Sequence, residues 1–163
     1  MLRFIRHLFA RSAQATFPEE SLQRVTAAVA EGELRHRGEI CFAVEAALEL
    51  PALWARCDAR TRAHQVFAQL RVWDTEANNG VLVYLLLADH RIEIVADRGL
   101  HGRVSDEQWR GVCQLMEERL RAGEPGDAAV AGVAAISDLL AEHFPRAEGD
   151  VDQNELPDLP HLL

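Results

Sequence analysis

Two stretches of the chain are apolar at nearly every position, a pattern typical of strands that lie in the centre of a sheet. Residues 39–48 read EICFAVEAAL and residues 80–88 read GVLVYLLLA. A tight turn at ADHR follows the second stretch, and IEIVAD then returns antiparallel, so these two segments are expected to form a hairpin. The pattern therefore predicts three strands, the first beginning near Glu39.

Apolar residues at helical spacing occupy most of the remaining chain. A first helix is expected to begin at Thr16, where T-x-x-E has the spacing of a capping box. A second is expected from Asp58 and a third from Ser105, where S-x-x-Q gives a second capping box. A fourth is expected to be capped by Asp127 and stopped by Pro145.

The order of these elements predicts the topology. A strand, a helix and a second strand form a right-handed crossover, so the first two strands should be parallel. The hairpin makes the third strand antiparallel to the second. The helices are numerous enough to cover both faces, so we expect an α/β fold, an α/β/α sandwich around a small mixed β-sheet.

The ends of the chain differ in composition from its middle. Residues 1–15 form a basic amphipathic segment in which Arg6, His7 and Arg11 interrupt what would have to be the apolar stretch of a signal peptide. This segment either packs on the domain or rests on an anionic membrane surface. Residues 16–146 form the domain, and residues 147–163, with two prolines and no lysine or arginine, are expected to be an acidic flexible tail.

Charge and cysteine usage narrow the range of partners. The net charge of −9 argues against nucleic acid and favours a cation or a basic protein. No apolar run approaches the roughly 20 residues of a transmembrane helix. The three cysteines show no metal-ligand spacing, which indicates a reducing compartment. We expect a cytoplasmic protein, with a peripheral membrane location left open by the basic N-terminal segment.

Polar residues collect where the strands begin or end at one edge of the predicted sheet. Glu39 starts the first strand, Asn78 and Asn79 precede the second, and Asp97 and Arg98 end the third. Oxygen-rich clusters suit hard cations such as calcium and magnesium, although Asn and Asp are also common turn residues. Two acids, Asp74 and Glu76, also precede the second strand. The candidate metal ligands are therefore Glu39, Asp74, Glu76, Asn78, Asn79 and Asp97.

Two other spacings resemble metal or catalytic signatures. Glu33 and His36 form E-x-x-H on one expected helix face, which fits either metal ligands or a surface pair. Cys113 and Arg119 have the C-x5-R spacing of cysteine phosphatases, but they lie within a predicted helix, where no loop could enclose a phosphate.

The middle of the chain, NNGVLVYLLLADHRIEIVADRGLHGRVSD, resembles the core of the TPM domain family. GEICFAVEAAL is similar to that family's first strand, and RAGEPGDAAVAGVAAISDLL to the segment along its last helix, so the likeness covers roughly residues 17–144. Asp97 stands where the family usually has glycine, and the acidic stretch expected before the first helix is missing near ATFPEES. The resemblance implies an α/β/α sandwich, and in some members calcium or magnesium binding or acid phosphatase activity.

Three functional hypotheses follow. The first is a non-catalytic TPM-type module that binds calcium, magnesium or a protein partner at the edge described above. In one form of this hypothesis the protein partner is associated with a membrane. The second is a metal-dependent phosphatase in which Arg98 holds the phosphoryl oxygens. The third is an interaction adaptor that acts through its basic N-terminal segment or its acidic tail.

Overall fold

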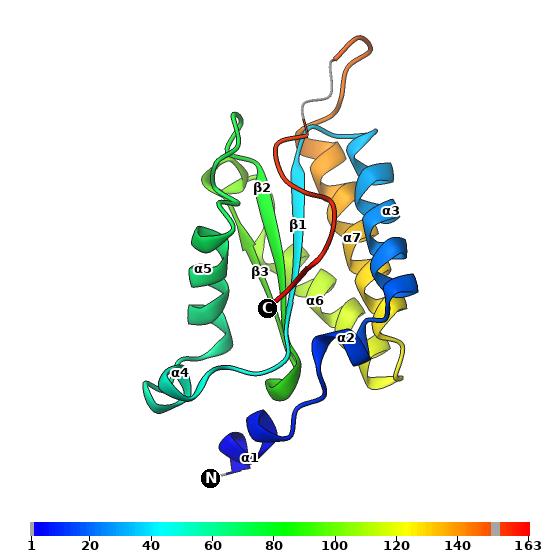
Figure 1. Ribbon diagram of the computed structural model, residues 1–163. Coiled ribbons are helices and arrows are strands. Elements are labelled where there is room, and N and C mark those ends of the chain that lie inside the picture. Colours follow the sequence, from blue (N-terminus) through cyan, green and yellow to red (C-terminus); the bar gives the residue numbers. More distant parts are fainter. Residues whose placement is uncertain (1, 151–153) are drawn as a thin grey trace.

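The computed structural model describes residues 2–150 and 154–163, and its elements alternate between helices and strands (Figure 1). Along the chain they are α1 (Leu2–Leu8), α2 (Ala13–Thr16), α3 (Glu19–Glu33), β1 (Glu39–Glu45), α4 (Leu50–Trp54), α5 (Ala59–Gln69), β2 (Gly80–Leu86), the short helix η1 (Leu87–Asp89), β3 (Arg91–Ala96), the short helix η2 (Arg98–Leu100), α6 (Asp106–Arg121), α7 (Pro125–His143) and β4 (His161–Leu162). No helix in these described residues is long and apolar enough to cross a membrane.

The sheet has the predicted strand directions. Its order is β3-β2-β1-β4. Strands β1 and β2 are parallel, with Glu39 opposite Gly80, and β3 is antiparallel to β2, with Ala96 opposite Val81. The expected crossover and hairpin are therefore both confirmed.

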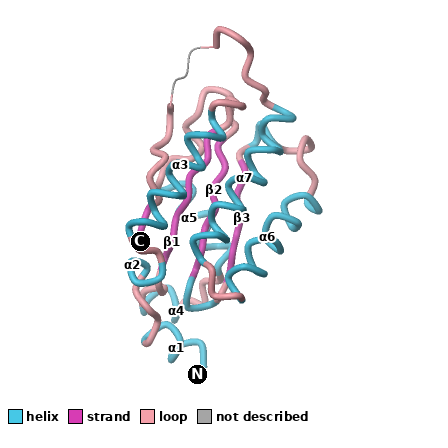
Figure 2. The backbone as a smooth tube through the Cα atoms, turned by 90° about the vertical axis from the view of Figure 1, so that its right-hand side faces the viewer, coloured by secondary structure: helices cyan, strands magenta, loops and turns pink. Residues whose placement is uncertain are grey.

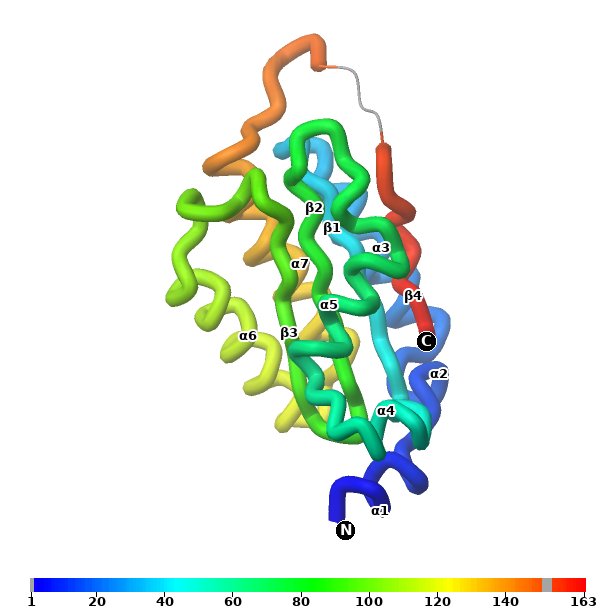
Figure 3. Tube along the Cα trace, turned by 90° about the vertical axis from the view of Figure 1, so that its left-hand side faces the viewer, coloured from blue at the N-terminus to red at the C-terminus, as the bar shows by residue number. Residues whose placement is uncertain are grey.

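Helices cover both faces of the sheet and make an α/β/α sandwich, as expected. Figures 2 and 3 show α3, α6 and α7 on one face and α5 on the other. Side chains of a strand alternate between its two faces, so β1 contributes Phe42 and Val44 to the core under α3 and α7 and Cys41 and Ala43 to the core under α5. Both central strands are buried along their whole length, which explains their unbroken apolar pattern.

Local chemistry sets several helix boundaries as predicted. At α6, the Ser105 hydroxyl accepts the Gln108 amide at 3.2 Å, and the Gln108 side chain accepts the Ser105 amide at 2.9 Å. At α5, Asp58 accepts the amide of Thr61 at 2.7 Å. Both caps satisfy N–H groups that a helix start leaves without partners. Helix α7 ends at His143, before Pro145.

Two predicted helix starts are wrong. Helix α3 begins at Glu19 rather than Thr16, and Thr16 instead ends the short helix α2. The cause is Pro18, because the residue that precedes a proline is kept out of the helical region. Helix α7 begins at Pro125, which suits the first helical position, so Asp127 lies inside the first turn and pairs with Arg24 instead of capping the helix.

The composition of the last residues predicts a disordered or loosely docked tail, and the described part of that segment contacts the domain. His161 and Leu162 pair in parallel with Ala43 and Val44 and so add β4 to the edge of the sheet. Leu156 is buried in the core under α5. The acidic composition of this segment therefore does not prevent it from docking on the domain, because its few apolar residues pack against the core.

Gly80, the first residue of β2, is a position at which only glycine fits. A Cβ atom at Gly80 would lie 2.0 Å from the carbonyl oxygen of Val72. Because that oxygen belongs to the backbone, it cannot rotate away as a side chain could. Gly111 in α6 offers the opposite case, since a Cβ there would meet no atom within 4 Å.

We predict that Gly80→Ala lowers the free energy of unfolding by about 3 kcal/mol, near the upper end for overpacking. Gly111→Ala should instead leave it unchanged or raise it by up to about 1 kcal/mol, since alanine favours a helix interior. Urea unfolding of both variants measures the difference. Equal stability of the two would contradict the close approach of Val72 to Gly80.

A buried polar network links β1, β2 and α5 under the α5 face. The Tyr84 hydroxyl donates to Glu45 at 2.6 Å, and Arg62 donates to both oxygens of the same carboxylate at 2.8 and 3.0 Å. Burial, followed by the bond to Glu45, raises the pKa of Tyr84, so its hydroxyl stays protonated as the donor. Glu45 is thus the shared acceptor of two groups.

We predict that Glu45→Ala lowers the free energy of unfolding by about 3–5 kcal/mol, because it leaves Arg62 and the Tyr84 hydroxyl without their acceptor. Glu93→Ala is the matched control. Glu93 pairs with Arg60 and Arg91, whose side chains are at least half exposed, so its loss should cost about 1 kcal/mol or less. The predicted ranking would be refuted by a larger loss in Glu93→Ala, measured by thermal and urea unfolding.

Candidate functional site

The ends of three strands meet at one edge of the sheet, which we call the rim: Glu39, Asn78, Asn79, Gly80, Asp97 and Arg98. Backbone hydrogen bonds hold it together. The amide of Asp97 donates to Gly80 at 2.9 Å, that of Gly99 to Asn78 at 2.8 Å and that of Glu39 to Asn79 at 3.4 Å. The structure therefore gathers the strand-end residues that the topology predicts, at the upper end of the sheet in Figure 1.

Glu39, Gly80 and Asp97 form one row across the three strands. They continue the row of Cys41, Leu82 and Val95, whose side chains all belong to the core under α5. Because side chains alternate along a strand, Glu39 and Asp97 face the α5 side, on either side of Gly80. Gly80 has no side chain, so the carbonyl of Val72 lies over the space between the two acids.

Asp97 has two oxygens in different situations. Oδ1 accepts the amide of Arg98 at 2.7 Å and caps η2. Oδ2 is buried and accepts no hydrogen bond from the described part of the chain. A buried carboxylate oxygen without a donor is costly, which makes Oδ2 the strongest indication of a missing ligand at the rim.

Asn79 shows a similar imbalance. Its amide donates to the Thr75 hydroxyl at 3.1 Å, and its side-chain Nδ2 donates to the carbonyl of Arg37 at 2.7 Å. The second bond fixes the orientation of the side chain. Its Oδ1 is buried and, within residues 2–150 and 154–163, accepts no hydrogen bond. Because side chains alternate along β2, Asn79 faces the side of α3 and α7, opposite to Asp97.

The C-terminal segment contributes to the rim, which the sequence did not reveal. Oε2 of the buried Glu39 accepts the amide of Leu156 at 3.2 Å. One residue earlier, the carboxylate of Glu155 accepts the amide of Glu76 at 2.9 and 3.3 Å. Glu155 is thus an additional acid beside the strand entry. The only sequence signal for it was the acidic composition of the tail.

The other predicted ligands have different roles. Asp74 forms an ion pair with Arg71 and its side chain is half exposed. Glu76 is exposed. Asn78 adopts a left-handed backbone with φ 52°, and its Oδ1 accepts Nε of Arg98 at 2.7 Å. The turn interpretation therefore suits Asn78, and Arg98 is directed at Asn78 rather than held for a phosphate.

In the described ranges, no group of three or more His, Cys, Asp or Glu residues could hold a metal ion. Glu39 and Asp97 supply two carboxylates, and the remaining oxygens of the rim come from Asn79 and the backbone. These are oxygen ligands of the type that hard cations prefer, and not the nitrogen and sulfur ligands of zinc.

Glu33 and His36 do not share a helix face, because α3 ends at Glu33. Nor do they form a surface pair, since both are buried. The ring Nδ1 of His36 lies 2.9 Å from the carbonyl of Gly38, so it carries the proton of the neutral ring. Burial lowers the pKa of His36 from 6.5 to about 4; the bond to Gly38 opposes this shift, and Arg35 and Arg146 add to it.

We predict that this histidine makes the protein less stable in mild acid. The unfolded chain binds a proton at pH 6.5 and the folded one only near pH 4, so stability is complete above pH 6.5 and falls as the pH drops towards 4. The loss is about 3 kcal/mol.

Unfolding free energies measured between pH 7 and 4 test this prediction. In His36→Gln the part of the pH dependence of stability that comes from His36 should be lost. His64→Gln, at an exposed position of α5, serves as the control. Identical pH profiles for the wild type and His36→Gln would contradict the burial of a neutral His36.

Comparisons with known proteins agree with this architecture, that of a small α/β/α domain with a mixed sheet. A family model of the TPM domain matches residues 12–139, and the chain belongs to the TPM domain family. It is similar to the NMR structure of BA42 protein from the psychrophilic bacterium Bizionia argentinensis, with a TM-score of 0.75 and 28% identity over 87% of this chain and 92% of that one. No curated protein matches the chain.

Proposed function

We propose that this chain is a binding module whose rim takes up a divalent cation, with calcium as the preferred ion. Asp97 Oδ2 is its central ligand, and Glu39, in the same row of the sheet, supplies further negative charge. The observation that carries the proposal is the buried Oδ2 of Asp97, which has no donor in the described chain. A bound cation would compensate this oxygen directly.

The arrangement favours calcium over magnesium. Calcium accepts six to eight oxygens in flexible geometry, whereas magnesium requires a near-ideal octahedron. At the rim, the hydrogen bond from the Arg98 amide fixes the Asp97 side chain in place, so the protein can adjust little to a small ion. With few carboxylates available, we expect a dissociation constant of about 0.1–1 mM, the weak end of protein calcium sites.

The geometry supports phosphatase activity less well. Arg98 is engaged with Asn78. Cys113 lies within α6, and burial, followed by the charges of Glu93 and Glu117, raises the pKa of its thiol to about 11. A thiol in that state is protonated at neutral pH and is a poor nucleophile. Cation binding is therefore the function that the described residues support best.

We predict that calcium binds to the wild type with measurable heat and that Asp97→Asn weakens binding at least tenfold, because it removes the ligand charge. Asparagine keeps the size of the side chain and an oxygen that can still cap η2. Isothermal titration calorimetry with calcium and with magnesium measures both affinities.

Asp74→Asn is the control, since Asp74 lies near the same strand entry but is paired with Arg71, and its affinity should remain that of the wild type. Absence of calcium binding in the folded wild type would refute the proposal. So would equal affinities of Asp97→Asn and the wild type.

A further inference from the structure

Helix α1 lies at the end of the molecule away from the rim, beside α4 (Figures 1 and 3). Hydrogen bonds join the two regions. The amide of Leu48, just before α4, donates to Nδ1 of His7 at 2.9 Å. Arg3 donates to the carbonyl of Cys57, just after α4, at 2.7 Å.

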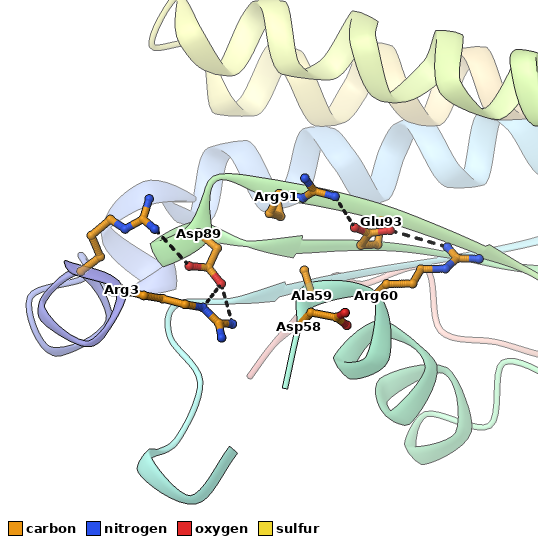
Figure 4. Close-up of a pocket in the computed structure, with 8 residues that line it drawn as sticks. Arg3, Asp58, Ala59, Arg60, Asp89, Arg91 and Glu93 are labelled. Atoms are coloured by element: carbon orange, nitrogen blue, oxygen red, sulfur yellow. Dashed lines mark hydrogen bonds and ion pairs between the residues drawn. The ribbon is translucent and has the colours of Figure 1, made fainter. Parts of the chain in front are cut away.

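The polar face of α1 is the one that attaches to the domain. Arg3 donates to Oδ2 of Asp89 at 2.8 and 2.9 Å, and Nε2 of the buried His7 lies 3.1 Å from Oδ1 of the same residue. Figure 4 shows Asp89 facing Arg3 in a pocket of about 380 Å³, where Arg60 and Arg91 also meet Glu93. Against the penalty of burial, the bonds from Arg3 and His7 lower the pKa of Asp89, so it remains an anion at neutral pH.

The apolar face of α1 is consequently directed at solvent. Leu2, Ile5, Leu8 and Phe9 are 80%, 49%, 66% and 81% exposed, and their spacing puts them on one side of a helix. On the adjoining α4, Leu50 and Trp54 are 52% and 76% exposed. Apart from Phe4, which packs against the core under α5, this short helix attaches through Arg3 and His7 and leaves its leucine and isoleucine side chains exposed, unlike a helix whose apolar face stabilises its own domain.

A groove beside α1 extends this apolar surface. It has a volume of about 1270 Å³, and Ile5 and Phe9 form part of its wall together with Leu87 and Leu120. Arg6 and Arg11 also line it. The exposed apolar side chains are thus continuous with a hollow that arginines border beside α1 and that Glu117, Glu124 and Asp127 also line.

The charges at this end differ from those of the whole chain. Residues 2–11 contain arginines and no acid, although the net charge is −9. Arg11 and Arg56 are exposed and form no ion pair within the described residues. Apolar side chains flanked by unpaired arginines are typical of surfaces that insert into the headgroup region of anionic membranes, and tryptophan favours that interface.

We propose that α1 and α4 form a docking surface for an anionic lipid bilayer, which attaches the domain to the membrane by its end opposite the rim. Leu2, Ile5, Leu8, Phe9 and Trp54 enter the interface, while Arg11 and Arg56 face the lipid phosphates. A second copy of the chain is disfavoured as the occupant, because pairing two such ends would bring their unpaired arginines together. The proposal is independent of cation binding at the rim.

Co-sedimentation tests this with vesicles of phosphatidylcholine alone or mixed with phosphatidylglycerol. The wild type should bind the mixed vesicles and bind less at high salt. Leu8→Ser should reduce the partition coefficient about tenfold, and Arg11→Gln about fivefold. Both positions are exposed, so neither change should unfold the domain, and thermal unfolding verifies this.

Matched controls lie at the rim end. Leu34 is 70% exposed at the end of α3, and Trp73 is 49% exposed between α5 and β2. Leu34→Ser and Trp73→Ala should bind vesicles as strongly as the wild type. Leu8→Ser and Trp54→Ala should bind them more weakly. The proposal is overturned if the wild type does not bind, or if all variants bind equally. The proposal is also overturned if the wild type forms a dimer, does not bind vesicles, and loses the dimer in Leu8→Ser. That result would assign the apolar face to a second copy of the chain.

Discussion

Backbone hydrogen bonds on both sides of Gly80 are the interaction on which the rim depends. Through them β2 holds β1 in parallel and β3 in antiparallel register, so that Glu39 and Asp97 reach the same edge. The absence of a side chain at Gly80 lets the Val72 carbonyl close over the gap. A shift of one residue in either strand would turn the acid of that strand towards the opposite face. The chemistry of the rim is thus a consequence of strand pairing.

The same strands separate two chemically different ends. A strand of seven residues spans roughly 20 Å, and the network of Glu45, Tyr84 and Arg62 lies towards the end of β1 that is opposite the rim. The rim end offers buried oxygens, while the α1 end offers exposed apolar side chains and arginines. If both proposals hold, a domain attached to a membrane by α1 would present its cation site away from the lipid surface.

Much of this architecture follows from local patterns in the sequence. The three longer strands, their directions and the capping box at Ser105 are all legible, because each rests on burial or on neighbouring residues. The predicted start of α3 is wrong because Pro18, and not the T-x-x-E spacing, sets the beginning of this helix. Strand β4 was missed, since two residues after a proline-rich acidic stretch carry no strand pattern and pair only in the folded chain. Strand direction predicts the rim but not the roles of its side chains. Asp74 forms an ion pair with Arg71, three residues earlier, and Glu155, from a segment distant in the sequence, accepts the amide of Glu76.

Whether the unmatched carboxylate oxygen of Asp97 binds an ion is the central question. Amide NMR shifts recorded during a calcium titration of the full chain address it residue by residue. Saturable shifts at millimolar calcium, confined to the amides of residues 78–80 and 97–99, are the result that the account predicts. Shifts that are absent, or that are centred on α1 and α4 instead, would contradict it.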